Sequence, residues 1–177
     1  FKYKKSKFDS SGNKGMIYLS KMDKNEISIN DFSPIGSDER QYCSPGFNLP
    51  VGQLSRGETY FKNYHTSLDT FELIDPKSII ATVNLLEDWY DLISINRKYI
   101  NLKPFGEAHL SKYNLYPKTN FGNEKDLTTR ALLWLMNFSD GNNDLVDISS
   151  FSKTDIIMLS EIAENCEKEG LIKQLEK

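Results

Sequence analysis

The order of elements expected over residues 126–177 constrains the fold of this chain more than any other feature. A helix that Asp126 can cap ends at Asp140-Gly141, and a short apolar piece follows over 145–148. A longer amphipathic helix then ends at Gly170, and a closing strand completes the chain. Helix, short helix, longer helix and strand is the order of a small winged helix-turn-helix, so we predict that fold here.

A second strong helix signal covers residues 75–95. Asp75 can cap this helix, and Pro76 suits its first position. Apolar residues then recur every three or four positions and predict one stripe that packs in a core: Ile79, Val83, Leu86, Trp89 with Tyr90, and Ile93. In the C-terminal region, Ser152 precedes Asp155 by three positions, the spacing of a capping box with Asp in place of Glu.

The regions around these helices carry weaker signals. Residues 1–30 begin with a lysine-rich stretch, which we interpret as a solvated loop and strand edge. Residues 31–70 are broken by proline and glycine and are expected to be loops that present polar side chains. Residues 97–125 show no period and are expected to form an extended connector.

Composition narrows the class of protein. The chain has 177 residues, of which 38% are hydrophobic and 27% charged, with a formal net charge of −3. This composition is typical of a soluble globular protein with one or two domains, and it gives no field that attracts nucleic acid or an anionic membrane. No apolar run has the roughly 20 residues that a membrane span needs, and the abrupt start without Met suggests a fragment or a processed chain. Cys43 and Cys166 are expected to be free thiols in a reducing cytoplasm.

His65 is the first candidate for chemistry. It lies among hydroxyl side chains and close to Asp69, which could accept its second ring N–H and orient the imidazole toward a metal. A catalytic zinc ion normally takes three protein ligands, and this chain has only one other histidine, His109, and no HExxH pair. From the residues alone, a hydrogen-bonded loop histidine is the favoured interpretation.

A second candidate is the charged segment 36–41, which follows a proline turn. Asp38 or Glu39 could form an ordinary loop ion pair with Arg40. Alternatively, the two carboxylates orient an active-site group, and the guanidinium of Arg40 binds a substrate carboxylate. The spacing does not choose between these interpretations.

Two segments together resemble zinc aminopeptidases of the bacterial leucyl aminopeptidase type. They are a Ser-Asp stretch at Ser37-Asp38, which runs on to Pro50-Val51, and Tyr64-His65-Thr66-Ser67-Leu68-Asp69-Thr70. The resemblance implies that His65 is a zinc ligand supported by Tyr64 and Asp69, and that Asp38, Glu39 and Arg40 serve the catalytic site. The cofactor that it implies is zinc.

The chain is similar over nearly its whole length to a bacterial subfamily of aminopeptidase-like proteins linked to polysaccharide biosynthesis. The shared segments include Lys103-Pro104-Phe105-Gly106-Glu107 and Leu115-Tyr116-Pro117. The implied α/β fold is the C-terminal part of a zinc-exopeptidase-like mixed sheet flanked by helices, followed by the winged helix. We therefore expect an aminopeptidase-like part over 1–96, a connector over 97–125 and a winged helix over 126–177.

The resemblance implies hydrolysis of an N-terminal peptide bond or a related amide by metal-activated water. The remaining zinc ligands and the general-base glutamate of the superfamily lie upstream of this region, so this chain alone is expected to be inactive. The expected partners are a peptide or aminoacyl substrate and a protein partner or the upstream half of the same protein, with homo-oligomers as a further option and no membrane. The alternative is a non-enzymatic binding or assembly module.

The charge of the predicted winged helix argues against a nucleic-acid partner. Residues 127–177 hold five basic and nine acidic residues, a net charge of −4. Phosphate contacts dominate affinity for DNA, and acidic residues on the recognition helix oppose them. We therefore interpret this module as a packing or protein-contact domain.

Overall fold

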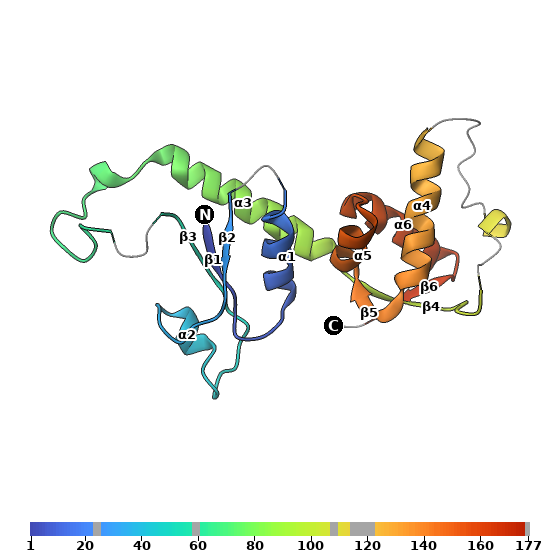
Figure 1. The fold of residues 1–177 in the computed structure, drawn as a ribbon, viewed down its shortest axis with the longest axis horizontal. Coiled ribbons are helices and arrows are strands. Elements are labelled where there is room, and N and C mark those ends of the chain that lie inside the picture. The colour runs from blue at the N-terminus through green and yellow to red at the C-terminus, as the bar shows by residue number, and fades with distance from the viewer. Residues whose placement is uncertain (23–25, 58–60, 107–109, 114–122, 176–177) are drawn as a thin grey trace. The chain divides into compact units, whose positions relative to one another are not determined.

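In the computed structural model the chain forms two compact units, Phe1–Ser94 and Ile95–Lys177 (Figure 1). The structure describes residues 1–22, 26–57, 61–106, 110–113 and 123–175. His109, Glu107 and the segment 115–117 of the sequence analysis lie outside these ranges.

The first unit is built around a three-stranded sheet of order β2-β1-β3. Strand β1 (Lys2–Lys4) pairs in parallel with β2 (Ser28–Asn30) and antiparallel with β3 (Gln53–Ser55). The interpretation of the lysine-rich start as a strand edge is therefore wrong, because β1 is the central strand. Lysines are accommodated at and just after this central strand because they form ion pairs. The ammonium group of Lys4 contacts Glu39, and that of Lys5 contacts Asp31.

Helix α1 (Ser11–Leu19) connects β1 to β2 and is fixed to the sheet by a buried asparagine. The Tyr3 hydroxyl donates to Asn13 Oδ1 at 3.0 Å, and burial raises the pKa of Tyr3 to about 12. The Asn13 amide in turn donates to the Ser6 hydroxyl at 2.9 Å and to the Phe8 carbonyl at 2.7 Å. A buried side-chain amide with these partners holds the loop before α1 in one conformation.

Helix α3 (Pro76–Ile95) has the predicted position, and Asp75 accepts hydrogen bonds at its start from the Lys77 amide and the Ser78 hydroxyl. It packs on α1 through glycine. A Cβ at Gly15 would lie 2.9 Å from the side chain of Ile93, so only glycine permits this approach. The Trp89 indole donates to the Gly12 carbonyl at 3.0 Å across the same contact.

The buried face of α3 differs from the predicted stripe. Leu85 and Leu92 are its buried residues. Four residues of the predicted stripe are instead exposed: Ile79, Val83, Leu86 and Tyr90. The prediction of a helix is confirmed, but the prediction that this stripe packs in a core is wrong for these four residues in the described structure.

Short elements complete the first unit. Helix α2 (Glu39–Tyr42) lies between β2 and β3, and the 3-10 helix η1 (Phe71–Leu73) precedes α3. These elements carry the segments that the sequence analysis singled out for chemistry.

The second unit combines a sheet of order β5-β4-β6 with three helices. Strand β4 (Lys98–Asn101) is central and antiparallel to both β5 (Asp140–Asp144) and β6 (Ile172–Gln174). Residues 98–101 of the predicted extended connector thus form the central strand of a sheet. The sequence did not show this strand because four residues are too few to show a period. The 3-10 helix η2 (Leu110–Tyr113) follows β4 in the chain.

Helices α4 (Asn123–Phe138), α5 (Leu145–Ser152) and α6 (Ile156–Lys168) cover this sheet. Because α4 begins before Asp126, that residue is not its N-cap. The capping box lies at Asp144 and Asp147 of α5 rather than at Ser152 and Asp155, although Asp155 caps α6 through the amides of Ile157 and Met158. The predicted stop at Gly170, where φ is +68°, and the closing strand are confirmed.

The chain is thus a mixed α/β protein with small sheets flanked by helices and a winged-helix unit at its C-terminal end, as predicted. Cys43 and Cys166 are free, as expected, and both are buried. Across the described residues, no helix combines the length and the apolar character that crossing a membrane requires.

Candidate functional site

The loop before α2 is held by a buried ion pair. Lys4 on β1 contacts the carboxylate of Glu39, whose side chain is only 3% exposed. The Lys4 ammonium also donates to the carbonyls of Ser33 and Ile35, and Glu39 accepts from the amide of Ser37 at 3.1 Å. These contacts tie residues 33–39 to the central strand, so they fix the position of the segment that contains the predicted site residues.

The side chain of Glu39 is buried, and its carboxylate contacts the ammonium group of Lys4 and accepts a hydrogen bond from the amide of Ser37. Asp38 and Arg40, on either side of it, are exposed and line a cavity of about 620 Å³. The Arg40 side chain donates to the Gly36 carbonyl at 3.2 Å, which directs part of the guanidinium along this loop. Of the three predicted catalytic residues, the structure therefore brings two to the cavity and places the third behind it.

Tyr64 and His65 line the same cavity from a later loop. The two rings are stacked with centroids 3.9 Å apart, and Phe61 meets Tyr64 edge-on at 5.8 Å. His65 has a left-handed backbone with φ of +58°, which is uncommon for a residue other than glycine. Residues other than glycine in sparsely populated backbone regions cluster at active sites and ligand-binding sites.

The hydroxyl of Thr66 and the backbone of Asp69 support this loop. Thr66 donates to the Asn63 carbonyl at 2.7 Å and accepts from the amide of Leu68, while the Asp69 amide donates to the Thr66 carbonyl. Asp69 does not line the cavity. The backbone amide of Asp69 closes a turn on Thr66, and the predicted interaction of its carboxylate with the imidazole stays a prediction.

Sequence reasoning missed the residues that β3 adds to the cavity. Gln53, Ser55 and Arg56 lie on its wall, and the Arg56 guanidinium also donates to the Ser78 carbonyl and lies 4.5 Å over the Phe1 ring. A three-residue strand in a loop-rich stretch gives no period from which this placement could be predicted.

The residues present do not by themselves fit a zinc ion. In the part of the chain that the structure describes, no group of three or more His, Cys, Asp and Glu side chains could hold a metal. Asp38 and His65 share the cavity, but a catalytic zinc ion needs one more protein ligand beside the open position. The cavity therefore offers at most part of a ligand set.

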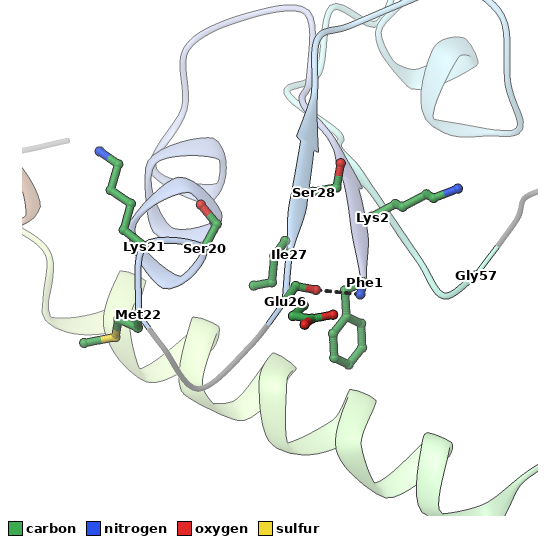
Figure 2. Close-up of a pocket in the computed structure, with 9 residues that line it drawn as sticks. All are labelled: Phe1, Lys2, Ser20, Lys21, Met22, Glu26, Ile27, Ser28 and Gly57. Atoms are coloured by element: carbon green, nitrogen blue, oxygen red, sulfur yellow. Dashed lines mark hydrogen bonds between the residues drawn. The ribbon is translucent and has the colours of Figure 1, made fainter.

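A second cavity, of about 670 Å³, lies at the start of β1 and β2 and is shown in Figure 2. Its wall is formed by Phe1 and Lys2, by Ser20–Met22 after α1, and by residues 26–28 and Gly57. The Phe1 amino group donates to the Glu26 carbonyl at 2.7 Å. Among its described lining residues, this cavity contains none of the residues predicted for chemistry, and Glu26 is the only one with a carboxylate side chain.

Comparison with known proteins extends this description. Residues 97–174 match a family described as winged helix-turn-helix, which confirms the prediction for the second unit. A Clostridium acetobutylicum protein named "Putative polysaccharide biosynthesis protein with aminopeptidase-like domain" is 39% identical over 124 residues. That match covers 70% of this chain and 29% of the relative.

A solved structure shares the fold over almost the whole chain. The crystal structure of a "putative peptidase" from Clostridium acetobutylicum is 32% identical, with a TM-score of 0.75, and the match covers 98% of this chain. It covers 38% of the chain in the crystal, so the present chain spans about a third of the length of these two relatives. Residues 1–96 match a further family model, and the chain therefore belongs to the family described as "Domain of unknown function (DUF4910)".

Proposed function

We propose that this chain carries one wall of the active site of a zinc-dependent, aminopeptidase-like hydrolase, with His65 as a metal ligand. One observation supports this proposal above the others. The folding of the chain brings His65 into the same cavity as Asp38 and Arg40, more than twenty residues earlier in the sequence. The names of the two Clostridium acetobutylicum relatives agree with a peptidase-like class.

Each side chain of the cavity has a separate role in this proposal. Tyr64 stacks on the imidazole and holds its plane, while the left-handed backbone of His65 sets its direction. Arg40 binds a negatively charged group of the substrate, because its planar donors match a carboxylate. Asp38 contributes an oxygen ligand or orients the substrate. Glu39 positions the loop through Lys4 and does not touch the reacting atoms.

The missing ligands must come from outside the described residues. When bound, zinc would supply an activated water and polarise the scissile carbonyl. The substrate class is a peptide or an aminoacyl amide. The name of the relative that is 39% identical suggests a role in polysaccharide biosynthesis.

Zinc binding tests the ligand assignment directly. In the longer Clostridium acetobutylicum relative, changing the residue at the position of His65 to alanine should reduce bound zinc to less than a tenth of a stoichiometric ion. In this chain, His65→Ala should remove any zinc binding detected by titration, and His109→Ala, which changes the other histidine, should leave it unchanged. Zinc content that survives the change at position 65 would reject the assignment.

A non-enzymatic binding module remains the second candidate, and the surface of α6 favours it. Among the described residues of this helix and its C-cap, Glu161, Glu164, Glu167 and Glu169 are all exposed. Such a surface suits a basic protein segment rather than a nucleic acid. An inactive full-length relative that binds no zinc would favour this second candidate.

A further inference from the structure

Helix α3 has two apolar faces, and the first unit uses only one of them. Leu85 and Leu92 are 1% and 6% exposed and, with the half-buried Trp89, they face the rest of the unit. A second stripe repeats at positions 79, 83, 86 and 90, and the exposed fractions of its side chains are between 41% and 65%. At 3.6 residues per turn these four positions lie along one side of the helix.

The exposed stripe continues into the segment before the helix. Phe71 is 87% exposed, and Leu73 and Ile74 are each 51% exposed, while Ile80 adds a 60% exposed side chain within the first turn of α3. We call this set the α3 apolar surface: Phe71, Leu73, Ile74, Ile79, Ile80, Val83, Leu86 and Tyr90. A helix that is apolar over so wide an arc is normally buried on both sides. An exposed set of large apolar side chains of this kind marks an interface.

We infer that the α3 apolar surface is covered by the part of the peptidase-like protein that this chain does not span, so that α3 becomes a buried helix of a larger domain. This inference rests on the proposed function, because the same missing part is the one expected to supply the remaining zinc ligands. The matched region covers 29% of one relative and 38% of the other, so each relative is about two and a half to three and a half times as long as the region that matches. That length is sufficient to bury a helix face.

The composition of the surface favours this occupant over a transient partner. The stripe of Ile79, Val83, Leu86 and Tyr90 carries no charged residue, and the acidic residues Glu87, Asp88 and Asp91 lie at positions of the helix outside this stripe. Two further charged side chains, Glu72 and Lys77, lie beside the surface at its N-terminal end. Permanent interfaces that form during folding are largely apolar, whereas transient interfaces carry more polar residues.

Matched substitutions on neighbouring positions of α3 test the inference. Val83→Asp places a carboxylate on the α3 apolar surface, and Asn84→Asp places the same group on the exposed position beside it. In the full-length Clostridium acetobutylicum relative, the change aligned with Val83→Asp should lower the melting temperature by about 5 °C or more, because a buried carboxylate loses its hydration. The change aligned with Asn84→Asp should shift it by less than about 1 °C, and in the present chain both substitutions should have this small effect.

Three outcomes would overturn the inference. The first is an equal, small effect of both substitutions in the full-length relative. The second is a large loss of stability from Val83→Asp in the present chain alone, which would mean that its own unit covers the face. The third is a dimer of the present chain that light scattering detects and that the Val83→Asp substitution dissociates. This result would mean that a second copy covers the α3 apolar surface. Zinc content measured in the same full-length variants reports on the metal site separately, so either idea can fail while the other stands.

Discussion

The two units of this chain differ in how completely each one buries its own apolar residues. In the winged-helix unit, Leu132, Leu145, Leu159 and Leu171 are 2% exposed or less, and the three helices and the sheet all contribute to one core. In the first unit the described fully buried side chains are few, with Met16, Leu85 and Cys43 below 2%.

This difference concerns the packing inside each unit. The helices of the winged-helix unit pack on one another and on the strands of its sheet. The first unit has a small sheet, an incomplete ligand set and a helix with an unused apolar face. We therefore expect the first unit to depend on additional polypeptide and the second to be stable in its present form. The predictions below test the comparison.

The largest expected effect concerns the thiol of Cys166 in the core of the second unit. Burial raises the pKa of this thiol to about 12 from an ordinary value of 9.0. At pH 8 the thiolate of Cys166 should then be about a thousandfold less populated in the native protein than in the unfolded chain. In a Cys43→Ser variant, which leaves Cys166 as the one thiol, a thiol reagent should therefore react far more slowly under native conditions than in denaturant. Equal rates in the two conditions would show that the core of the second unit is open.

A smaller effect is expected from truncating Leu159, which is fully buried in α6. Leu159→Ala should reduce the free energy of unfolding by about 2–5 kcal/mol, because it removes apolar contacts and leaves a cavity. Ile157→Ala, two positions earlier and 59% exposed, should change it by less than about 0.5 kcal/mol. Chemical denaturation followed by the fluorescence of Trp134, in a Trp89→Phe background, measures both, and similar effects of the two changes would contradict a closed core.

In the first unit, the ion pair behind the cavity should contribute more than its exposed neighbour. Lys4→Met leaves the Glu39 carboxylate buried without its cation and should cost about 1.5–3 kcal/mol of unfolding free energy. Lys5→Met removes a pair with Asp31 that is exposed to solvent and should have little effect. Trp89 fluorescence in a Trp134→Phe background reports on this unit, and equal effects of the two lysine changes would show that Glu39 does not position the loop.

The smallest effect is expected in a DNA-binding assay of the second unit within the full chain. The acidic residues exposed on α6 should prevent nanomolar binding of duplex DNA at physiological salt, in spite of the winged-helix fold. A gel-shift titration checks this expectation. Tight binding that weakens steeply with salt would contradict it and would make the second unit a nucleic-acid module.

Local signals predicted α3, the helices of the second unit and the winged-helix fold because caps and helical periods act over a few residues, whereas α1 and α2 were not predicted. Asp75 and Pro76 begin α3, and Gly170 ends the last helix, as their chemistry requires. The strands were harder to predict. β4 is central to its sheet but only four residues long, so pairing with strands far along the chain determines its structure.

The candidate site could be predicted in part. The motif around His65 and the charged segment at residues 36–41 meet at one cavity, as the resemblance implies for neighbouring parts of an active site. The orientation of each carboxylate could not be predicted. Asp38 and Glu39 are adjacent, yet only Asp38 lines the cavity, because Glu39 forms an ion pair with Lys4 on the central strand.

The sequence by itself determined the start of α3, the end of α6, the winged helix-turn-helix and the segments that hold the candidate chemistry, because these features depend on neighbouring residues. Only the tertiary structure decided which apolar face of α3 is buried, since Gly12 and Gly15 of α1 admit Trp89 and Ile93 on one side of the helix. It also decided that Arg56 joins the cavity and that Glu39 does not. These outcomes depend on contacts between residues that are distant in the chain, and no local pattern encodes them.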